Sequence, residues 1–286
     1  MIRDTIAAAR ELAAWVREHA APLFLTTVAA FPCLFYAAHG PPADLKILPS
    51  MAVSLFLVLP LWAVTVHDAR DRASQLLAGA GLVLGLAPPL VWGYGPGGRE
   101  YLKAHPDPMV IGAFLGLALT LAAVLRSTDA KAWGLGTGDF RWWRQPVGLL
   151  LTMILVCIPI VAWIFPDFAE FYPRYKPARA GDPLALLEYQ VAMGIYMFSW
   201  EYLFRGFVLF GCARYVGPVA AILIQAFPFF LLHDGKPEPE FAISWFGGIL
   251  MGWLCWRARC MWPSFLLHWI LYATMEVSAF GLRALG

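Results

Sequence analysis

The chain has 286 residues, of which 60% are hydrophobic and only 14% are charged, and its mean hydropathy is +0.64. Soluble domains carry about 25% charged residues, so this composition excludes an ordinary soluble domain, and a disordered chain would be poorer in apolar residues. The net charge of +2 is too small to indicate a nucleic-acid-binding protein. We therefore predict an all-α, polytopic transmembrane helical bundle with about 8–9 spans.

The first 21 residues are interrupted by charges and lack the apolar core of a secretory signal. Their apolar residues recur at helical spacing, so we predict that 1–21 form an amphipathic helix along the membrane interface. Residues 22–286 are predicted to form a single transmembrane domain. Its apolar stretches, each near the length of about 20 residues that a bilayer requires, are 22–38, 47–67, 73–94, 108–126, 146–165, 185–213, 218–233, 239–257 and 261–282.

The connectors between the predicted spans indicate an orientation. Lys and Arg are somewhat more frequent in the connectors on the same side as the N-terminus. Because cytoplasmic connectors carry an excess of these residues, we predict a cytoplasmic N-terminus. The composition, rich in Ala, Arg, Trp and Pro, suggests a bacterium with a genome rich in G and C, so the predicted location is the bacterial inner (plasma) membrane.

Ionisable residues within the predicted spans are concentrated in the C-terminal third. An ionisable side chain in the bilayer is costly and tends to face the protein interior and to serve a function. Glu201 and Arg205 lie four residues apart on one helix face, in the order that favours an ion pair. His233 ends the next span, and His268 lies inside the last one. We predict that these four residues form one functional site; a purely structural ion pair is the alternative for the first two.

One carboxylate and two imidazoles limit the chemistry of such a site. They can activate water as a general base and stabilise an oxyanion, a combination that suits amide hydrolysis. Glu201, His233 and His268 could instead ligate zinc and leave one position open for water. The sequence has no H-E-x-x-H helix, and we expect no obligatory metal or other cofactor. No convincing serine- or cysteine-hydrolase signature is visible either.

Three short motifs follow one another in the region 185–282. Residues 200–206 read W-E-Y-L-F-R-G, residues 229–233 read F-F-L-L-H, and residues 268–272 read H-W-I-L-Y. In order and spacing they resemble the Glu-Glu-x-x-x-Arg, Phe-x-x-x-His and His-x-x-x-Asn/Asp motifs of the CPBP family of intramembrane proteases, also called the CAAX-protease or Abi family. A Gly-Gly-x-x-x-Gly run at 247–252 adds to the likeness. The resemblance implies an endopeptidase that acts on a membrane-anchored or lipidated protein or peptide.

The chain departs from the family pattern at two positions. Trp200 stands where the family has the glutamate thought to activate water, and Tyr272 stands where it has Asn or Asp. Three interpretations are open. Glu201 is the base and Tyr272 donates to the oxyanion; or another acid, Glu238 or Glu240, holds the water; or the chain is a catalytically inactive membrane scaffold. We expect an active enzyme, because the other motif residues are retained together.

For an active enzyme the resemblance implies a division of roles. Glu201, oriented by Arg205, would act with His233 to activate a water that attacks the peptide carbonyl. His268, assisted by Tyr272, would stabilise the oxyanion. A transporter of protons or small solutes that uses the same buried charges is the alternative from another class. Transporters of this size often consist of repeated halves, whereas the ionisable groups here are confined to one third of the chain.

The positions of the motifs along their spans impose a geometric requirement. Glu201 lies in the middle of its predicted span, whereas His233 and His268 lie near opposite membrane faces. A common pocket therefore requires a tilted or broken helix, and Pro228 is the candidate break.

Overall fold

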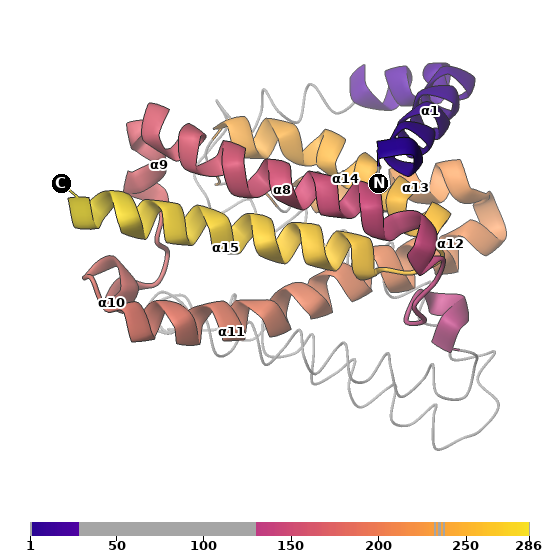
Figure 1. Ribbon diagram of the computed structural model, residues 1–286. Helices are drawn as coiled ribbons and strands as arrows, with labels where there is room; N and C mark the ends of the chain where they lie inside the picture. Colours follow the sequence, from indigo (N-terminus) through magenta and orange to yellow (C-terminus); the bar gives the residue numbers. More distant parts are fainter. Residues whose placement is uncertain (1, 29–129, 232, 234–235, 237, 286) are drawn as a thin grey trace, which may run out of the picture.

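The computed structural model describes residues 2–28, 130–231, 233, 236 and 238–285 (Figure 1). Within these ranges every regular element is a helix, as predicted. The predicted spans 47–67, 73–94 and 108–126 lie outside the described residues, as does most of 22–38, of which 22–28 are helical.

The described helices follow the predicted spans closely from residue 146 onward. In chain order the elements are α1 (Ile2–Glu18), η3 (Ala130–Trp133), α8 (Phe140–Ile164), α9 (Pro166–Phe171), α10 (Lys176–Arg179), α11 (Pro183–Glu201), the π-helix η4 (Tyr202–Val208), α12 (Leu209–Val216), α13 (Pro218–Leu231), α14 (Glu238–Ala258) and α15 (Trp262–Leu285). By length and composition, α8 and α15 are able to cross a membrane. The count of 8–9 spans stays a prediction.

The last helix organises the described part of the bundle. α15 lies between α8 and α11 and packs against both of them, and it also contacts α14 (Figure 1). α8 begins after Asp139, whose carboxylate accepts a hydrogen bond from the backbone N–H of Trp142 at 3.2 Å, so the helix has a side-chain N-cap. α1 packs against α8 and is joined to α14 by an exposed ion pair between Glu11 and Arg257. Its predicted place at the membrane interface stays a prediction.

Two features of the sequence allow α13 to pack against its neighbours. Gly217 ends α12 with a φ of +78°, a conformation that glycine adopts without strain, and Pro218 begins α13. α13 then packs on α14 where the latter has Gly248 and Gly252, and a Cβ at Gly252 would overlap the amide nitrogen of Gln225. That nitrogen donates to the carbonyl of Gly248 at 2.9 Å. Small residues thus permit close contact between these helices.

The helix that carries Glu201 is broken where a single span, 185–213, was predicted. It changes to a π-helix at Tyr202 and returns to an α-helix at Leu209. π-helical segments are rare in proteins, and those that occur often lie at functional sites. The break predicted at Pro228 is absent, because α13 continues through that residue to Leu231. The helix distortion that a common pocket was expected to require therefore lies in the first motif, directly after Glu201.

Candidate active site

Glu201 and Arg205 form a completely buried ion pair. The Nη1 atom of Arg205 donates to Oε1 of Glu201 at 3.0 Å, and both side chains have 0% exposure. The guanidinium lies over the ring of Phe229, with its central carbon 3.8 Å from the ring centroid. The first motif is thus held against the second by a cation–π contact as well as by packing.

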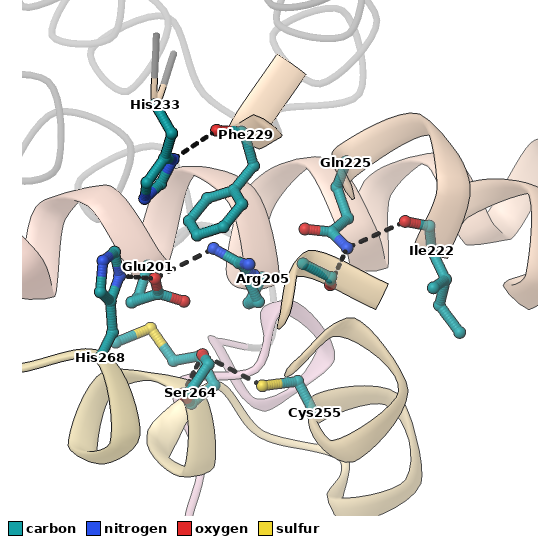
Figure 2. Close-up of polar contacts among 11 residues, drawn as sticks. Glu201, Arg205, Ile222, Gln225, Phe229, His233, Cys255, Ser264 and His268 are labelled. Atoms are coloured by element: carbon teal, nitrogen blue, oxygen red, sulfur yellow. Dashed lines mark hydrogen bonds and ion pairs between the residues drawn. The ribbon is translucent and has the colours of Figure 1, made fainter. Parts of the chain in front are cut away.

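The histidine of the third motif binds the same carboxylate oxygen. Nδ1 of His268, on the second turn of α15, lies 2.6 Å from Oε1 of Glu201 (Figure 2). Because the adjacent Arg205 favours an ionised carboxylate, Glu201 is the acceptor and His268 the donor. The carboxylate therefore lies between a guanidinium and an imidazole, and it determines the orientation of that imidazole.

His233 is held by its own helix end. Its Nδ1 atom donates to the carbonyl oxygen of Phe229 at 2.7 Å, since a carbonyl can only accept. The imidazole packs on the ring of Phe229 and stacks near His268, with 6.0 Å between the two imidazole centroids and 27° between their planes. The structure thus brings together Glu201, Arg205, His233 and His268 from three separate segments.

The hydrogen bonds of the two histidines determine which nitrogens are available. Each ring uses Nδ1 as a donor, so in the neutral state each carries its lone pair on Nε2. Neither Nε2 atom has a hydrogen-bond partner among the described residues. Both His233 and His268 line a cavity of about 160 Å³. Two imidazoles, each with an available Nε2, therefore border a space large enough for water and part of a substrate.

The carboxylate that reaches this cavity is not Glu201. Glu240 lines the cavity, whereas Glu201 lies behind His268. Lys236 donates to Oε1 of Glu240 at 2.9 Å, and the hydroxyl of Tyr172 donates to Oε2 at 2.7 Å. Burial, together with the charge of Glu240, raises the pKa of Tyr172 above its usual value, so the hydroxyl stays protonated. The side chain of Glu238, the other acid considered from the sequence, lies outside the described residues.

The two residues that depart from the family motifs have different surroundings. Tyr272 lines the cavity, and its hydroxyl lies 3.0 Å from the hydroxyl of Tyr189 on α11. Trp200 is buried among aromatic rings, with the centroid of Phe204 at 5.1 Å and that of His233 at 6.4 Å. A polar group therefore replaces Asn or Asp at the cavity, while an apolar ring replaces the first glutamate.

The described residues do not offer a three-ligand metal site. No group of three His, Cys, Asp or Glu side chains among them is arranged to hold a metal ion. Glu201 and His268 bind each other, and so the three candidate ligands do not point to one centre. That activity needs no metal stays a prediction, and chelation tests it.

Comparison with known proteins agrees with the geometry. Residues 183–274 match the family described as type II CAAX prenyl endopeptidase Rce1-like. The match confirms the resemblance of this region to the CPBP, or CAAX-protease, family. The match covers all three motifs, and it points in general terms to a membrane protease. No curated protein and no solved structure matches the chain.

Several contacts at the site were missed from the sequence. Phe229 was recognised only as a motif letter, although its ring contacts Arg205 and its carbonyl binds His233. Tyr189 and Tyr172 carry no sequence pattern, since their partners lie 83 and 68 residues away. Lys236 has a weak signal, namely its position four residues before Glu240.

Proposed function

We propose that the chain is an intramembrane endopeptidase that hydrolyses a peptide bond of a membrane-associated protein or peptide. The observation that carries the proposal is the pair of imidazoles at one cavity, with Nδ1 of each engaged and Nε2 of each available. The name of the matched family points to a prenylated protein as the substrate class. Peptide hydrolysis needs a base for water and a donor for the oxyanion, and the cavity offers both.

His268 is the base favoured by the contacts. The Glu201 carboxylate accepts its Nδ1–H, maintains the tautomer with a lone pair on Nε2, and stabilises the imidazolium that forms when Nε2 takes a proton. Arg205 keeps that carboxylate ionised in a buried setting. This assignment differs from the roles inferred from the motifs, in which Glu201 and His233 share the base function, because Glu201 bonds to His268 and does not line the cavity.

His233 and Tyr272 complete the proposed mechanism. A water that donates one hydrogen to each Nε2 atom has its lone pair free to attack the peptide carbonyl. His268 takes one proton from this water as the carbon–oxygen bond forms, and Tyr272 donates its O–H to the oxyanion. Tyr189 can then donate in turn to the hydroxyl oxygen of Tyr272. As the carbon–nitrogen bond breaks, His268 returns its proton to the leaving amine.

Trp200 is compatible with this scheme because no step uses a carboxylate at its position. The aromatic ring fills space between Phe204 and Phe229 and helps to exclude water from the buried ion pair. The groups that hold and move protons all belong to residues that the chain retains. We therefore propose an active enzyme with the base function carried by the Glu201–His268 pair.

The test is cleavage of membrane-protein termini in cells and in proteoliposomes with wild-type protein and with Glu201→Gln. An amide in place of the orienting carboxylate is expected to lower kcat by up to about 10⁴-fold, the scale known for serine-protease triads. Arg257→Gln, which removes an exposed arginine, is the matched control. Wild-type rates in Glu201→Gln, with helicity and melting unchanged, would refute the assignment. Loss of activity on prolonged chelation, restored by zinc, would refute the metal-free mechanism.

A further inference from the structure

Two arginines at one end of the bundle lie over tryptophan rings and border the same pocket. The guanidinium of Arg214, in the last turn of α12, has its central carbon 4.0 Å from the centroid of the Trp133 ring. That of Arg259, in the turn after α14, lies 4.2 Å from the centroid of Trp256. All four residues line a pocket of about 480 Å³, which Phe210 also lines. The pocket thus combines two cations with three aromatic side chains.

No described residue neutralises the charges of these two guanidiniums. Arg214 and Arg259 are exposed, and neither side chain forms a hydrogen bond or an ion pair with a described residue. No carboxylate is among the described residues that line the pocket, and the carboxylate of Asp139, close by in the chain fold, caps α8. Stacking occupies the face of a guanidinium and leaves the N–H donors at its edge available, in a geometry that matches a phosphate. The pocket therefore offers paired positive charge to an anion.

Arg259 occupies a position at which the backbone favours glycine. α14 ends in a Schellman motif, since the N–H of Cys260 donates to the carbonyl of Cys255 at 3.2 Å and that of Arg259 donates to the carbonyl of Trp256 at 3.3 Å. The residue after such a helix end is usually glycine, because its φ is positive, and Arg259 has a φ of +59°. No other non-glycine residue among those described has a positive φ. The arginine is thus unfavourable for the backbone, a cost that an interaction of its side chain would offset.

The pocket lies at the end of the bundle where both candidate spans begin. The loop before α8 bonds to the turn before α15, from the N–H of Asp139 to the carbonyl of Ala258 at 2.8 Å and from that of Met261 to the carbonyl of Gly134 at 2.9 Å. Figure 1 shows α12 at the same end as the beginnings of α8 and α15. Because α8 and α15 are able to cross a membrane, we expect this end to lie at a membrane surface, on the side predicted to be cytoplasmic. Arginine and tryptophan side chains at this depth meet lipid headgroups.

We propose that this pocket binds the headgroup of an anionic phospholipid, with its phosphate contacted by Arg214 and Arg259 and its first acyl carbons packed on the aromatic side chains. The aromatic lining favours a lipid over a free phosphate, because a small soluble anion makes no use of it. The two positive charges favour an anionic lipid over a zwitterionic one, whose headgroup brings its own cation. The pocket shares no lining residue with the cavity at the two histidines. The proposal therefore goes beyond the proposed endopeptidase activity and does not depend on it.

The experiment measures the binding of single phospholipids to the full-length protein in detergent by native mass spectrometry, with dioleoyl phosphatidylglycerol and dioleoyl phosphatidylcholine as probes. An arginine near a membrane surface contributes about fivefold in affinity for an anionic lipid, so the wild type is expected to bind phosphatidylglycerol about 30-fold more tightly than phosphatidylcholine. Arg259→Gly should lower the affinity for phosphatidylglycerol about fivefold. Because glycine suits the positive φ, the same variant should not melt below the wild type in lipid-free detergent. Arg214→Gln/Arg259→Gly should bind the two lipids equally.

Arg257→Gln is the matched control, because Arg257 is also exposed and lies two residues before Arg259 but does not line the pocket. It should keep the wild-type affinity for phosphatidylglycerol. Equal affinities of the wild type for the two lipids would overturn the proposal. So would an equal loss of affinity in Arg257→Gln and Arg259→Gly, since it would show a diffuse attraction to the charged end of the bundle.

Thermal unfolding in the same detergent separates the lipid from a free anion. Phosphatidylglycerol should raise the melting temperature of the wild type, by mass action on the folded state, but not that of Arg214→Gln/Arg259→Gly. Inorganic phosphate at the same concentration should leave both unchanged. An equal rise with phosphate and with the lipid would overturn the lipid assignment, because it would show a site for a soluble anion.

Discussion

Arg205 is the buried cation on which the charge balance of the site depends, and replacing it with Met tests that dependence. The substitution keeps an apolar side chain of similar length but leaves the Glu201 carboxylate, with 0% exposure, without its guanidinium partner. His268 then remains as its hydrogen-bond partner. A buried charge that loses its partner is strongly destabilising, because the desolvation of the remaining ion is no longer offset.

The size of the effect follows from these contacts. Breaking a buried ion pair on one side costs about 3–5 kcal/mol, and the cation–π contact of Arg205 with Phe229 adds up to about 2 kcal/mol when desolvated. With a shift of about 2–4 °C per kcal/mol for a chain of this size, the ion-pair term lowers the melting temperature of Arg205→Met by about 6–20 °C. The double variant Glu201→Gln/Arg205→Met should recover part of this loss, because it removes the uncompensated charge.

The assay is thermal unfolding in detergent, followed by circular dichroism for the two single variants, the double variant and Arg257→Gln. Arg257 pairs with Glu11 at a site where both side chains are 42% exposed, so its loss should cost at most about 1 kcal/mol. A melting temperature of Arg205→Met as close to wild type as that of the control would refute the reasoning. So would a double variant whose loss equals the sum of the single losses, since it would show no coupling between the two charges.

Three further outcomes are expected from particular contacts. Tyr172→Phe removes the hydrogen bond to Glu240 and should lower the free energy of unfolding by about 1.5–3 kcal/mol. Because the pKa of Tyr172 is raised in the folded protein, the stability of the wild type should fall as the pH rises above about 10, where the unfolded tyrosine ionises. The stability of the variant should fall less steeply in the same unfolding series. Gly194→Ala should lower the free energy of unfolding by about 1–3 kcal/mol, and with it the melting temperature, since its Cβ would overlap a tryptophan ring. Gly281→Ala should leave the melting temperature unchanged. Equal melting temperatures of the two variants would contradict the packing. Trp200→Glu, which restores the glutamate of the family motif, should destabilise the protein and fail to raise kcat, because the new carboxylate would be buried among aromatic rings; a faster enzyme would show that this position still supports the base.

The helices near the site could be predicted because their ends carry strong local signals. Gly217 and Pro218 separate α12 from α13, and the apolar run before Pro263 ends at a short polar turn. The π-helix could not be predicted, since Tyr202–Val208 is apolar apart from Arg205 and has no glycine or proline pair that indicates a change of helix type. All seven of its residues, the arginine included, are buried, so their surroundings come from distant parts of the chain.

The site itself was predictable only in part. The Glu201–Arg205 pair follows from helical spacing, and the grouping with the two histidines follows from the family motifs. The bond between Glu201 and His268 joins residues 67 positions apart, and no local pattern indicates it. The family motifs suggested that Glu201 and His233 share the base function, and they gave no sign that the imidazole of His233 bonds to the carbonyl of Phe229.

The loss of the first motif glutamate bears directly on which residue can act as base. With Trp200 in that position, the base has to be a group that borders the cavity, and Glu201 is excluded from direct contact because it lies behind His268. Glu240 borders the cavity, but both of its carboxylate oxygens are engaged, one by Lys236 and the other by the hydroxyl of Tyr172. The imidazoles remain, and of these His268 has a carboxylate behind it to stabilise the protonated state. In the proposed mechanism the chain therefore keeps a general base without the first glutamate, because Glu201 orients His268.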